Sequence, residues 1–293
     1  MSAIANIILG GVFHAAVLFM VAAGLQLVFG VQKIVNLACG SFYALGAYFG
    51  ITLVSVALKA GLPSVLLLPI LVIAGVVMAA IGPVIERLLR SVYDRDESFQ
   101  LLLTFALVLM FQDIIRFIWG ANPQSLDNVY LVYGKVNAGD FSVPIYNLLV
   151  IAAALGAAIG IGQLLQRTNY GRLLRATAEN RDMAEALGVD VRRIYASVFT
   201  LGTLLGTLGG ALVVPTAAAS LEMSVEVVIE AFAVVVIGGL GSMMGALIGA
   251  LFVGLIRAGS LVIYPEFEVL AIYLIVIVVL LFRPSGLFGK PAT

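Results

Sequence analysis

Long apolar runs separated by short polar breaks follow one another along the whole chain of 293 residues. A helix that crosses the hydrocarbon core of a bilayer, about 30 Å thick, needs about 20 predominantly apolar residues. On this criterion the pattern predicts about nine membrane segments, within a range of about eight to ten, because the seventh run is short and ends at a glycine-rich break. The predicted segments are residues 7–29, 35–58, 63–85, 99–119, 144–165, 194–218, 225–237, 243–263 and 267–282.

The polar breaks between these runs differ in character. Residues 86–98 form a charged break, and residues 120–143 form a longer loop that contains Asn, Asp, Gly and Pro. Inside that loop Val129–Tyr133 is predicted as a short strand, followed by a turn at Gly134 and Lys135. A third polar segment, residues 167–193, is rich in arginine and in helix-forming residues.

The composition excludes a soluble globular protein. Only 11% of the residues are charged and 62% are hydrophobic, with a mean hydropathy of +1.14. A soluble domain has about 25% charged residues, so this chain lacks the polar surface that a soluble protein of its length needs. We therefore predict an all-α polytopic membrane protein in which residues 1–293 form a single domain.

The inventory of reactive side chains argues against an enzyme. Cys39 is the only cysteine and His14 the only histidine, which excludes an intrachain disulfide and a histidine-based metal cluster or triad. The sequence has no nucleotide-binding P-loop, so we expect no ATP hydrolysis by this chain. The net charge is zero and no basic patch lies outside the loops, so nucleic acid is not an expected partner.

The orientation in the membrane follows from the lysines and arginines, which accumulate on the cytoplasmic side. Residues 86–98, residues 167–193 and the segment after residue 282 are basic, whereas residues 219–230 contain three glutamates and no cation. Nine segments with the N-terminus periplasmic and the C-terminus cytoplasmic satisfy all loops at once. Residues 167–193 are then expected to be a cytoplasmic loop, and residues 120–143 a periplasmic one.

The cytoplasmic loop has the local signals of two short helices. Residues 171–179 are compatible with a helix, Asn180 is a suitable cap for the next one, and Asp182 lies near its positive end. Gly188 stands where a helix ending near Leu187 needs a left-handed residue. This pattern suits contact with a soluble partner, but it is equally typical of an ordinary amphipathic inside loop.

Several motifs then carry a family resemblance. The sequence GRLLRATAEN at residues 171–180 and AEALGV at 184–189 resemble the coupling loop of branched-chain amino acid permeases, in a shortened form of the general "EAA…G" signature. Residues 24–48, 230–250 and 280–289 resemble other parts of the same family, closer to its LivH-type than to its LivM-type members. Cys39 stands where the family usually has His, and Met243-Met244 where Ile-Pro is frequent.

The resemblance implies a non-catalytic permease subunit of an ATP-driven ABC importer in the bacterial inner membrane. It implies three kinds of partner: a second permease subunit, two cytoplasmic ATPase subunits that use ATP and Mg, and a periplasmic binding protein that delivers the substrate. Residues 121–143 and 219–230 are the candidates for docking the binding protein. The residues that the resemblance assigns to ATPase coupling are Gly171, Arg172, Arg175, Glu179, Asn180, Glu185, Ala186 and Gly188.

Two glycine-containing segments in the two halves of the chain are candidates for the translocation pathway. Gly40-Ser41 and Gly241-Ser242 are weakly similar, and paired glycine-interrupted spans point to a pathway between inverted repeats. Small residues that allow close helix packing explain the same pattern equally well. The candidate pathway residues are Gln26, Asn36, Ser41, Tyr43, Gly238, Gly239, Gly241 and Ser242.

The substrate is not identified by these patterns. Branched-chain amino acids are expected from the resemblance, and related permeases for urea, amides or small carboxylates are the alternative. A secondary transporter or channel is a weaker alternative, because the paired intramembrane acids that it would need are scarce in this sequence.

Overall fold

Helices make up most of the structure, a computed structural model that describes residues 2–93, 95–126, 130–138, 141–263, 265–283 and 286–289. The helices are α1 (Ser2–Gln32), α2 (Cys39–Lys59), α3 (Leu67–Ala79), α4 (Gly82–Leu89), α5 (Glu97–Trp119), α6 (Ile145–Arg167), α7 (Asn169–Glu179), α8 (Arg181–Ala186), α9 (Val191–Val213), α10 (Met223–Gly238), α11 (Met243–Ile263) and α12 (Glu268–Phe282), with short 3-10 turns at Ser64–Leu66, Arg90–Val92 and Pro265–Phe267.

Seven helical segments in the described chain are long and apolar enough to cross a membrane. Each of the nine predicted runs coincides with helix, but α10 has 16 residues and α12 has 15, so both are shorter than a full span. The third run is divided into α3 and α4 just before Pro83, because proline lacks an N–H and its ring disfavours helix in the residue that precedes it. The protein is therefore a helical, polytopic membrane protein.

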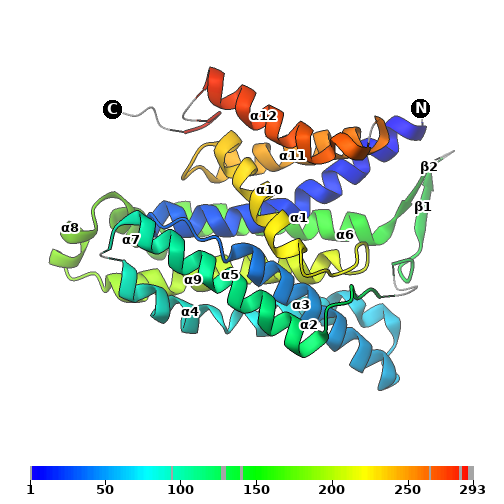
Figure 1. Cartoon of the computed structure of the whole chain (residues 1–293), viewed down its shortest axis with the longest axis horizontal. Helices are drawn as coiled ribbons and strands as arrows, with labels where there is room; N and C mark the ends of the chain where they lie inside the picture. The colour runs from blue at the N-terminus through cyan, green and yellow to red at the C-terminus, as the bar shows by residue number, and fades with distance from the viewer. Residues whose placement is uncertain are drawn as a thin grey trace.

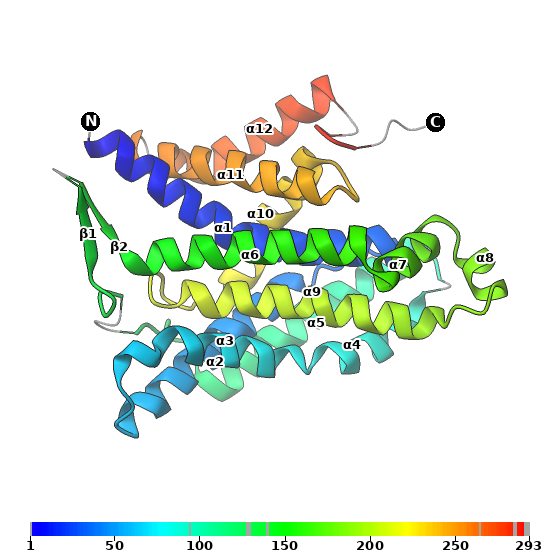
Figure 2. The same ribbon diagram turned by 180° about the vertical axis from the view of Figure 1, so that it is seen from behind.

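The helices form a bundle whose centre is α1 and α9 (Figures 1 and 2). These two helices approach closely because a glycine stands on each: a Cβ added at Gly24 would lie 2.6 Å from the carbonyl oxygen of Gly202. Small residues of this kind allow the close backbone contact that drives helix association in lipid. By contrast α6 lies at the outside of the bundle, and only a small part of its apolar surface is buried.

The segment between α9 and α10 folds back into the bundle (yellow in Figure 1). We predicted that the sixth run continues to Ala218, and this is wrong: α9 ends at Val213, two residues before Pro215. As a result α10 begins inside the bundle, where a Cβ on Gly40 of α2 would lie 1.9 Å from the carbonyl oxygen of Ser224.

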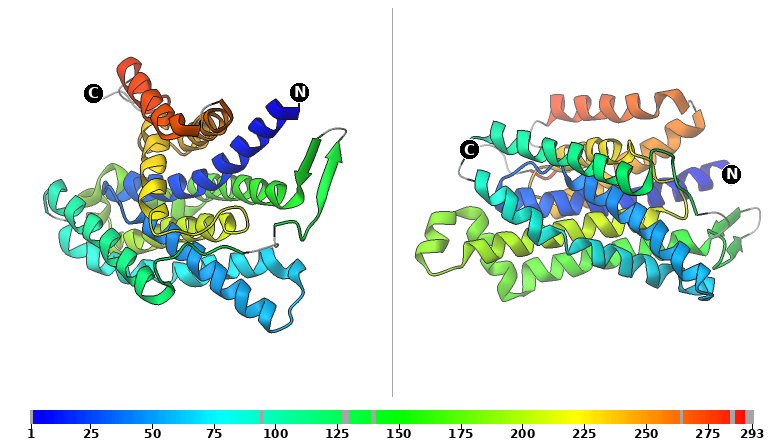
Figure 3. Two further views of the ribbon diagram at one scale, coloured as in Figure 1. Left: turned by 45° about the vertical axis from the view of Figure 1, so that its right-hand side comes forward. Right: turned by 60° about the horizontal axis from the view of Figure 1, so that its bottom comes forward.

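The predicted strand at Val129–Tyr133 is also wrong. Residues 130–133 form turns, while Val129 lies outside the described residues. The strands come later, β1 (Lys135–Ala138) paired antiparallel with β2 (Phe141–Pro144), with Lys135 opposite Pro144. Gly134 has a φ of +80°, so the predicted turn is present at that residue and leads into β1 rather than out of a strand. The hairpin projects from the end of the bundle that carries the N-terminus, opposite α8 (Figure 3).

Two predicted breaks lie elsewhere. The break expected near Gly40-Ser41 lies instead at residues 33–38, and α2 is continuous from Cys39 onwards. Gly40 does not interrupt the helix; it allows close packing against α10. The charged break predicted from residue 86 begins later, since Glu86 lies inside α4. Its carboxylate is fully buried and accepts hydrogen bonds from Arg90 (2.6 Å) and from the Tyr93 hydroxyl (3.1 Å).

Candidate functional site

The polar loop between α6 and α9 is built by three side-chain caps. The Thr168 hydroxyl accepts from the Gly171 N–H at the start of α7, and the Asn180 side chain accepts from the Met183 N–H (2.9 Å) at the start of α8. Asp190 accepts in the same way from the Arg193 N–H at the start of α9. Because each cap satisfies a backbone donor that the helix leaves open, the chain changes direction within very few residues.

The end of α8 follows the sequence prediction. Gly188 has a φ of +87°, its N–H donates to the Glu185 carbonyl (3.0 Å), and the Val189 N–H donates to the Ala184 carbonyl (3.1 Å). These two bonds are those of a Schellman motif, which needs a left-handed residue at this position. The predicted helix at 171–179, the cap at Asn180 and the role of Gly188 are confirmed.

All of the predicted coupling residues except Gly171 are exposed. Glu179 ends α7, and Glu185 and Ala186 lie on α8. Three others have structural contacts within α6 and α7: Gly171 packs against the carbonyls of Leu164 and Leu165, Arg175 donates to the Leu165 carbonyl, and Arg172 bonds to Asn169. Sequence reasoning missed the exposed apolar side chains of Met183 and Leu187, which are 58% and 78% exposed. Met183 within the short helix α8 and Leu187 directly after it were the available signal, because both are large apolar residues in a polar loop.

A row of aromatic contacts connects α8 to the transmembrane helices. The Arg181 guanidinium lies 5.9 Å from the centre of the Tyr195 ring at the start of α9, and that ring meets Tyr93 edge-on at 5.3 Å. Tyr93 in turn donates to the buried carboxylate of Glu86 in α4. The Tyr170 hydroxyl of α7 forms a hydrogen bond with Ser197 of α9, and burial raises the pKa of this hydroxyl. A displacement of α7 or α8 therefore has direct contacts through which it acts on α4 and α9.

The second predicted group, the glycine-rich break, is held by Gln26 of α1. The Gln26 amide donates to the Gly239 carbonyl (2.9 Å) and to the Ser242 carbonyl (3.3 Å), and its oxygen accepts from the Gly241 N–H (2.7 Å). Gly239 and Gly241 have φ values of +95° and +83°, which favour glycine. The structure thus brings Gln26, Gly238, Gly239, Gly241 and Ser242 together, and they form a brace between α1 and the turn from α10 to α11.

The C-terminal segment closes over the same turn. Leu287 and Phe288 donate their N–H groups to the carbonyls of Ile237 and Gly238, and a Cβ on Gly239 would lie 2.3 Å from the backbone nitrogen of Gly289. The glycines here allow three backbone segments to meet.

The remaining predicted pathway residues are not gathered in one place. Asn36 is buried and caps the turn into α2, accepting from the Ala38 N–H (3.1 Å). The Ser41 hydroxyl is buried without a hydrogen-bond partner in the described chain. Tyr43 lies within electrostatic range of Glu230, Arg257 and Glu226, which places it near a group of charges that the sequence analysis did not anticipate.

That group is an ion cluster between three helices. The Glu230 carboxylate of α10 lies 2.9 Å from the Arg257 guanidinium of α11 and 2.9 Å from the Nε2 atom of His14 in α1. The three side chains are 12%, 29% and 24% exposed. Ionisable side chains at this depth are expensive and mark functional positions. Arg257, a cation in the middle of an apolar run, was the signal that the sequence analysis overlooked.

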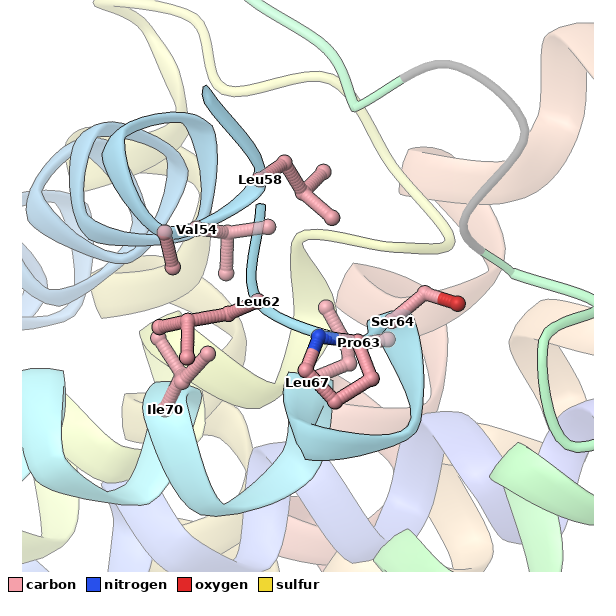
Figure 4. A pocket seen from close by; sticks show the side chains of 8 residues that line it. Val54, Leu58, Leu62, Pro63, Ser64, Leu67 and Ile70 are labelled. Carbon is pink, nitrogen blue, oxygen red and sulfur yellow. The ribbon is translucent and has the colours of Figure 1, made fainter. Parts of the chain in front are cut away.

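One hollow among the described residues, of about 10 Å³, lies at the turn between α2 and α3 and is lined mainly by aliphatic side chains such as Leu58, Leu62 and Ile70, with Ser64 at its rim (Figure 4). Another, of about 70 Å³, lies between α1, residue 35 and α10. Its lining is entirely apolar: Leu25, Phe29, Val35, Phe232, Val235, Val236 and Leu240. Among the described residues no group of three His, Cys, Asp or Glu side chains is placed to hold a metal.

A polytopic helical bundle with ionisable side chains between its helices is compatible with a membrane transport protein. The sequence pattern described as "Branched-chain amino acid transport system / permease component" matches residues 7–281. The chain therefore belongs to this family of ABC transporter permeases.

Individual relatives cover nearly the whole chain. The permease BraD of Pseudomonas aeruginosa is 26% identical over 93% of this chain and 91% of its own length, and LivH of Escherichia coli K12 is 25% identical over 96% and 94%. Both are described as high-affinity branched-chain amino acid transport permeases. The ribose import permease RbsC of Haemophilus influenzae is 24% identical over 89% and 80%. A solved metal-chelate-type ABC transporter in an inward-facing conformation aligns with a TM-score of 0.48 and 16% identity, over 92% and 86% of the two chains. That likeness is too distant to bear on function.

Proposed function

We propose that this protein is the permease subunit of an ATP-driven importer for branched-chain amino acids in the bacterial inner membrane. Membership of the family and the names of the full-length relatives support the substrate class. The observation that carries the proposal within the structure is the capped α7–α8 loop, whose exposed tip is connected by Tyr195 and Tyr93 to the membrane helices.

In this proposal α7 and α8 lie in the cytoplasm and contact two ATPase subunits, which bind ATP and Mg. The exposed Met183 and Leu187 supply the apolar part of the contact, and Glu179 and Glu185 supply its charge. Closure of the ATPase dimer pushes on α8, and the contacts of Arg181 with Tyr195 and of Tyr195 with Tyr93 pass the displacement to α9 and α4. The spans then rock between states that are open to the outside and to the inside.

The charges support this orientation. Six arginines lie between residues 167 and 193, and α4 and the following turn add Arg87, Arg90 and Arg95 at the same end. The opposite end has Lys59 at the end of α2, Arg116 at the end of α5 and Lys135 in the hairpin. The positive-inside rule places the first end in the cytoplasm. The hairpin then faces the periplasm, where a binding protein docks, whereas the segment before α10, the other candidate for docking, folds back into the bundle.

A second permease subunit completes the pathway. The face formed by α5, α10 and α12, which is turned toward the viewer in Figure 1, is the surface that we assign to this partner. The opposite face, with α6, is turned toward lipid (Figure 2). Nine segments cross or enter the membrane, with the N-terminus outside and α10 entering from the fold-back segment.

The test separates coupling from assembly. Glu185→Lys reverses an exposed charge on α8, and Ala186→Pro breaks the helix; each is expected to abolish leucine uptake while the protein still inserts in the membrane. Glu266→Lys, an exposed carboxylate at the other end of the bundle, is the matched control and keeps uptake. Normal uptake and normal ATPase stimulation in the α8 variants would contradict the proposal.

A further inference from the structure

The exposed face of α10 changes character along its length. Glu222, directly before α10, and Val225, Glu226 and Ile229 in its first turns are exposed; further along, Val236 is half-buried, and Leu240, just after the end of α10, is exposed. We call these six residues the α10 strip. Residues three, four and seven apart lie on one face of a helix, so Val225, Ile229 and Val236 share one side of α10.

The two outer carboxylates of the strip cannot face hydrocarbon. Neither Glu222 nor Glu226 forms an ion pair with any residue in the described part of the chain, although both are exposed. An unpaired charge inside a membrane span faces the interior of an assembly or a water-filled space. Both residues lie at the start of α10, which begins within the bundle beside Gly40 of α2.

The third carboxylate of this region, Glu230, is paired with neighbouring side chains. Glu230 follows Glu226 by one turn, about 6 Å along the axis. Its charge is balanced by Arg257 and shared with His14, so it stabilises the packing of α1, α10 and α11. The unbalanced charge of the strip is therefore at Glu222 and Glu226. A site with this potential attracts an ammonium group and disfavours a ligand whose only charge is negative.

The apolar part of the strip begins immediately afterwards. Phe232, Val236 and Leu240 form one wall of the hollow of about 70 Å³, and Leu25, Phe29 and Val35 lie opposite them. Binding sites for small molecules are lined mainly by apolar side chains, as this hollow is. Phe232 follows Glu226 by six residues, about 9 Å along the helix.

We propose that the α10 strip is a substrate-contact surface of the pathway. Glu226 receives the ammonium group of the amino acid at the outer side, and the hollow beside Phe232, Val236 and Leu240 then receives its aliphatic side chain. This inference rests on the proposed function and deepens it, because it makes the permease itself selective for an apolar side chain attached to an ammonium group. Small anionic carboxylates, urea and simple amides lack one or both features.

The test uses the complete importer in proteoliposomes, with both permeases, the ATPases, the binding protein and radiolabelled leucine. In Glu226→Gln, leucine uptake is expected to fall about tenfold or more, as for loss of one charge-assisted contact, while ATP hydrolysis stimulated by the binding protein continues. Glu226→Asp restores much of the uptake. Val236→Phe, which fills the hollow, lowers leucine uptake in the same uncoupled way, and Glu266→Gln is without effect.

The possible results distinguish failure of the α10 strip as a substrate contact from failure of the proposed function. Uptake by Glu226→Gln at the wild-type rate would refute the proposal that the α10 strip contacts the substrate. A parallel loss of uptake, ATP hydrolysis and protein level would refute it as well, since that pattern indicates a structural role. If the wild-type importer itself moves no branched-chain amino acid, the proposed function fails. If the wild type imports leucine and Glu226→Gln does so equally well, the proposed function stands and only the substrate contact at the α10 strip is refuted.

Discussion

Replacement of Gln26 by leucine tests the brace between α1 and the glycine-rich turn. The Gln26 side chain is 2% exposed and makes three hydrogen bonds to backbone groups of residues 239–242. Leucine has a similar size but neither donates nor accepts, so the Gly239 carbonyl and the Gly241 N–H lose their side-chain partner while the packing is largely retained.

The size of the effect follows from the two short bonds. Hydrogen bonds between membrane helices contribute about 0.6 kcal/mol each on average and about 1.7 at most. The bonds of 2.7 and 2.9 Å, together with the weaker one of 3.3 Å, therefore correspond to a loss of about 1–4 kcal/mol. For a protein of this length we expect the melting temperature in detergent to fall by several degrees, at about 2–4 °C per kcal/mol.

The matched control is Gln32→Leu near the end of the same helix. The Gln32 amide donates one bond, to the Tyr195 carbonyl at 2.8 Å, and its oxygen is buried without a partner in the described chain. Its replacement removes a single bond and one unsatisfied atom, so it should lower the melting temperature less than Gln26→Leu. Equal melting temperatures for Gln26→Leu and the wild type, or a larger loss in Gln32→Leu, would refute the reasoning.

Three further substitutions test other contacts. Asn180→Ala removes the cap of α8, worth about 1 kcal/mol, and should weaken co-purification of the ATPase subunits, whereas Asn180→Asp should keep it. Gly210→Ala places a Cβ 1.8 Å from the Tyr43 carbonyl and should abolish accumulation in the membrane, while Gly156→Ala, with nothing within 4 Å, should accumulate normally. Glu86→Gln removes the charge that pairs with Arg90 and should destabilise the protein by about 1–2 kcal/mol, less than for a fully buried pair because Arg90 is 37% exposed; an unchanged melting temperature would contradict the assigned pairing.

The local features of the cytoplasmic loop could be predicted because they depend on neighbouring residues. A cap at Asn180 needs only an Asn with a free N–H three residues later, and the left-handed Gly188 needs only the end of a helix before it. The apolar runs were likewise sufficient for the class of protein, since only helices and closed barrels satisfy the backbone in lipid.

The fold-back segment and the charge cluster could not be predicted in this way. Pro215 gives a reason for α9 to stop, but that α10 starts beside Gly40 depends on packing between residues far apart in the chain. His14, Glu230 and Arg257 are separated by more than 200 residues at the widest, and their meeting is a property of the folded bundle.

By itself, then, the sequence determined the membrane class, the helical runs, the capped loop and the family, because hydropathy, capping and motifs act over short distances along the chain. Only the tertiary structure decided that Gly40 serves packing, that Gln26 braces the glycine-rich turn, and that the acidic and apolar residues of α10 share one exposed face. These features depend on contacts between helices, and no local pattern specifies which helix a given face will meet.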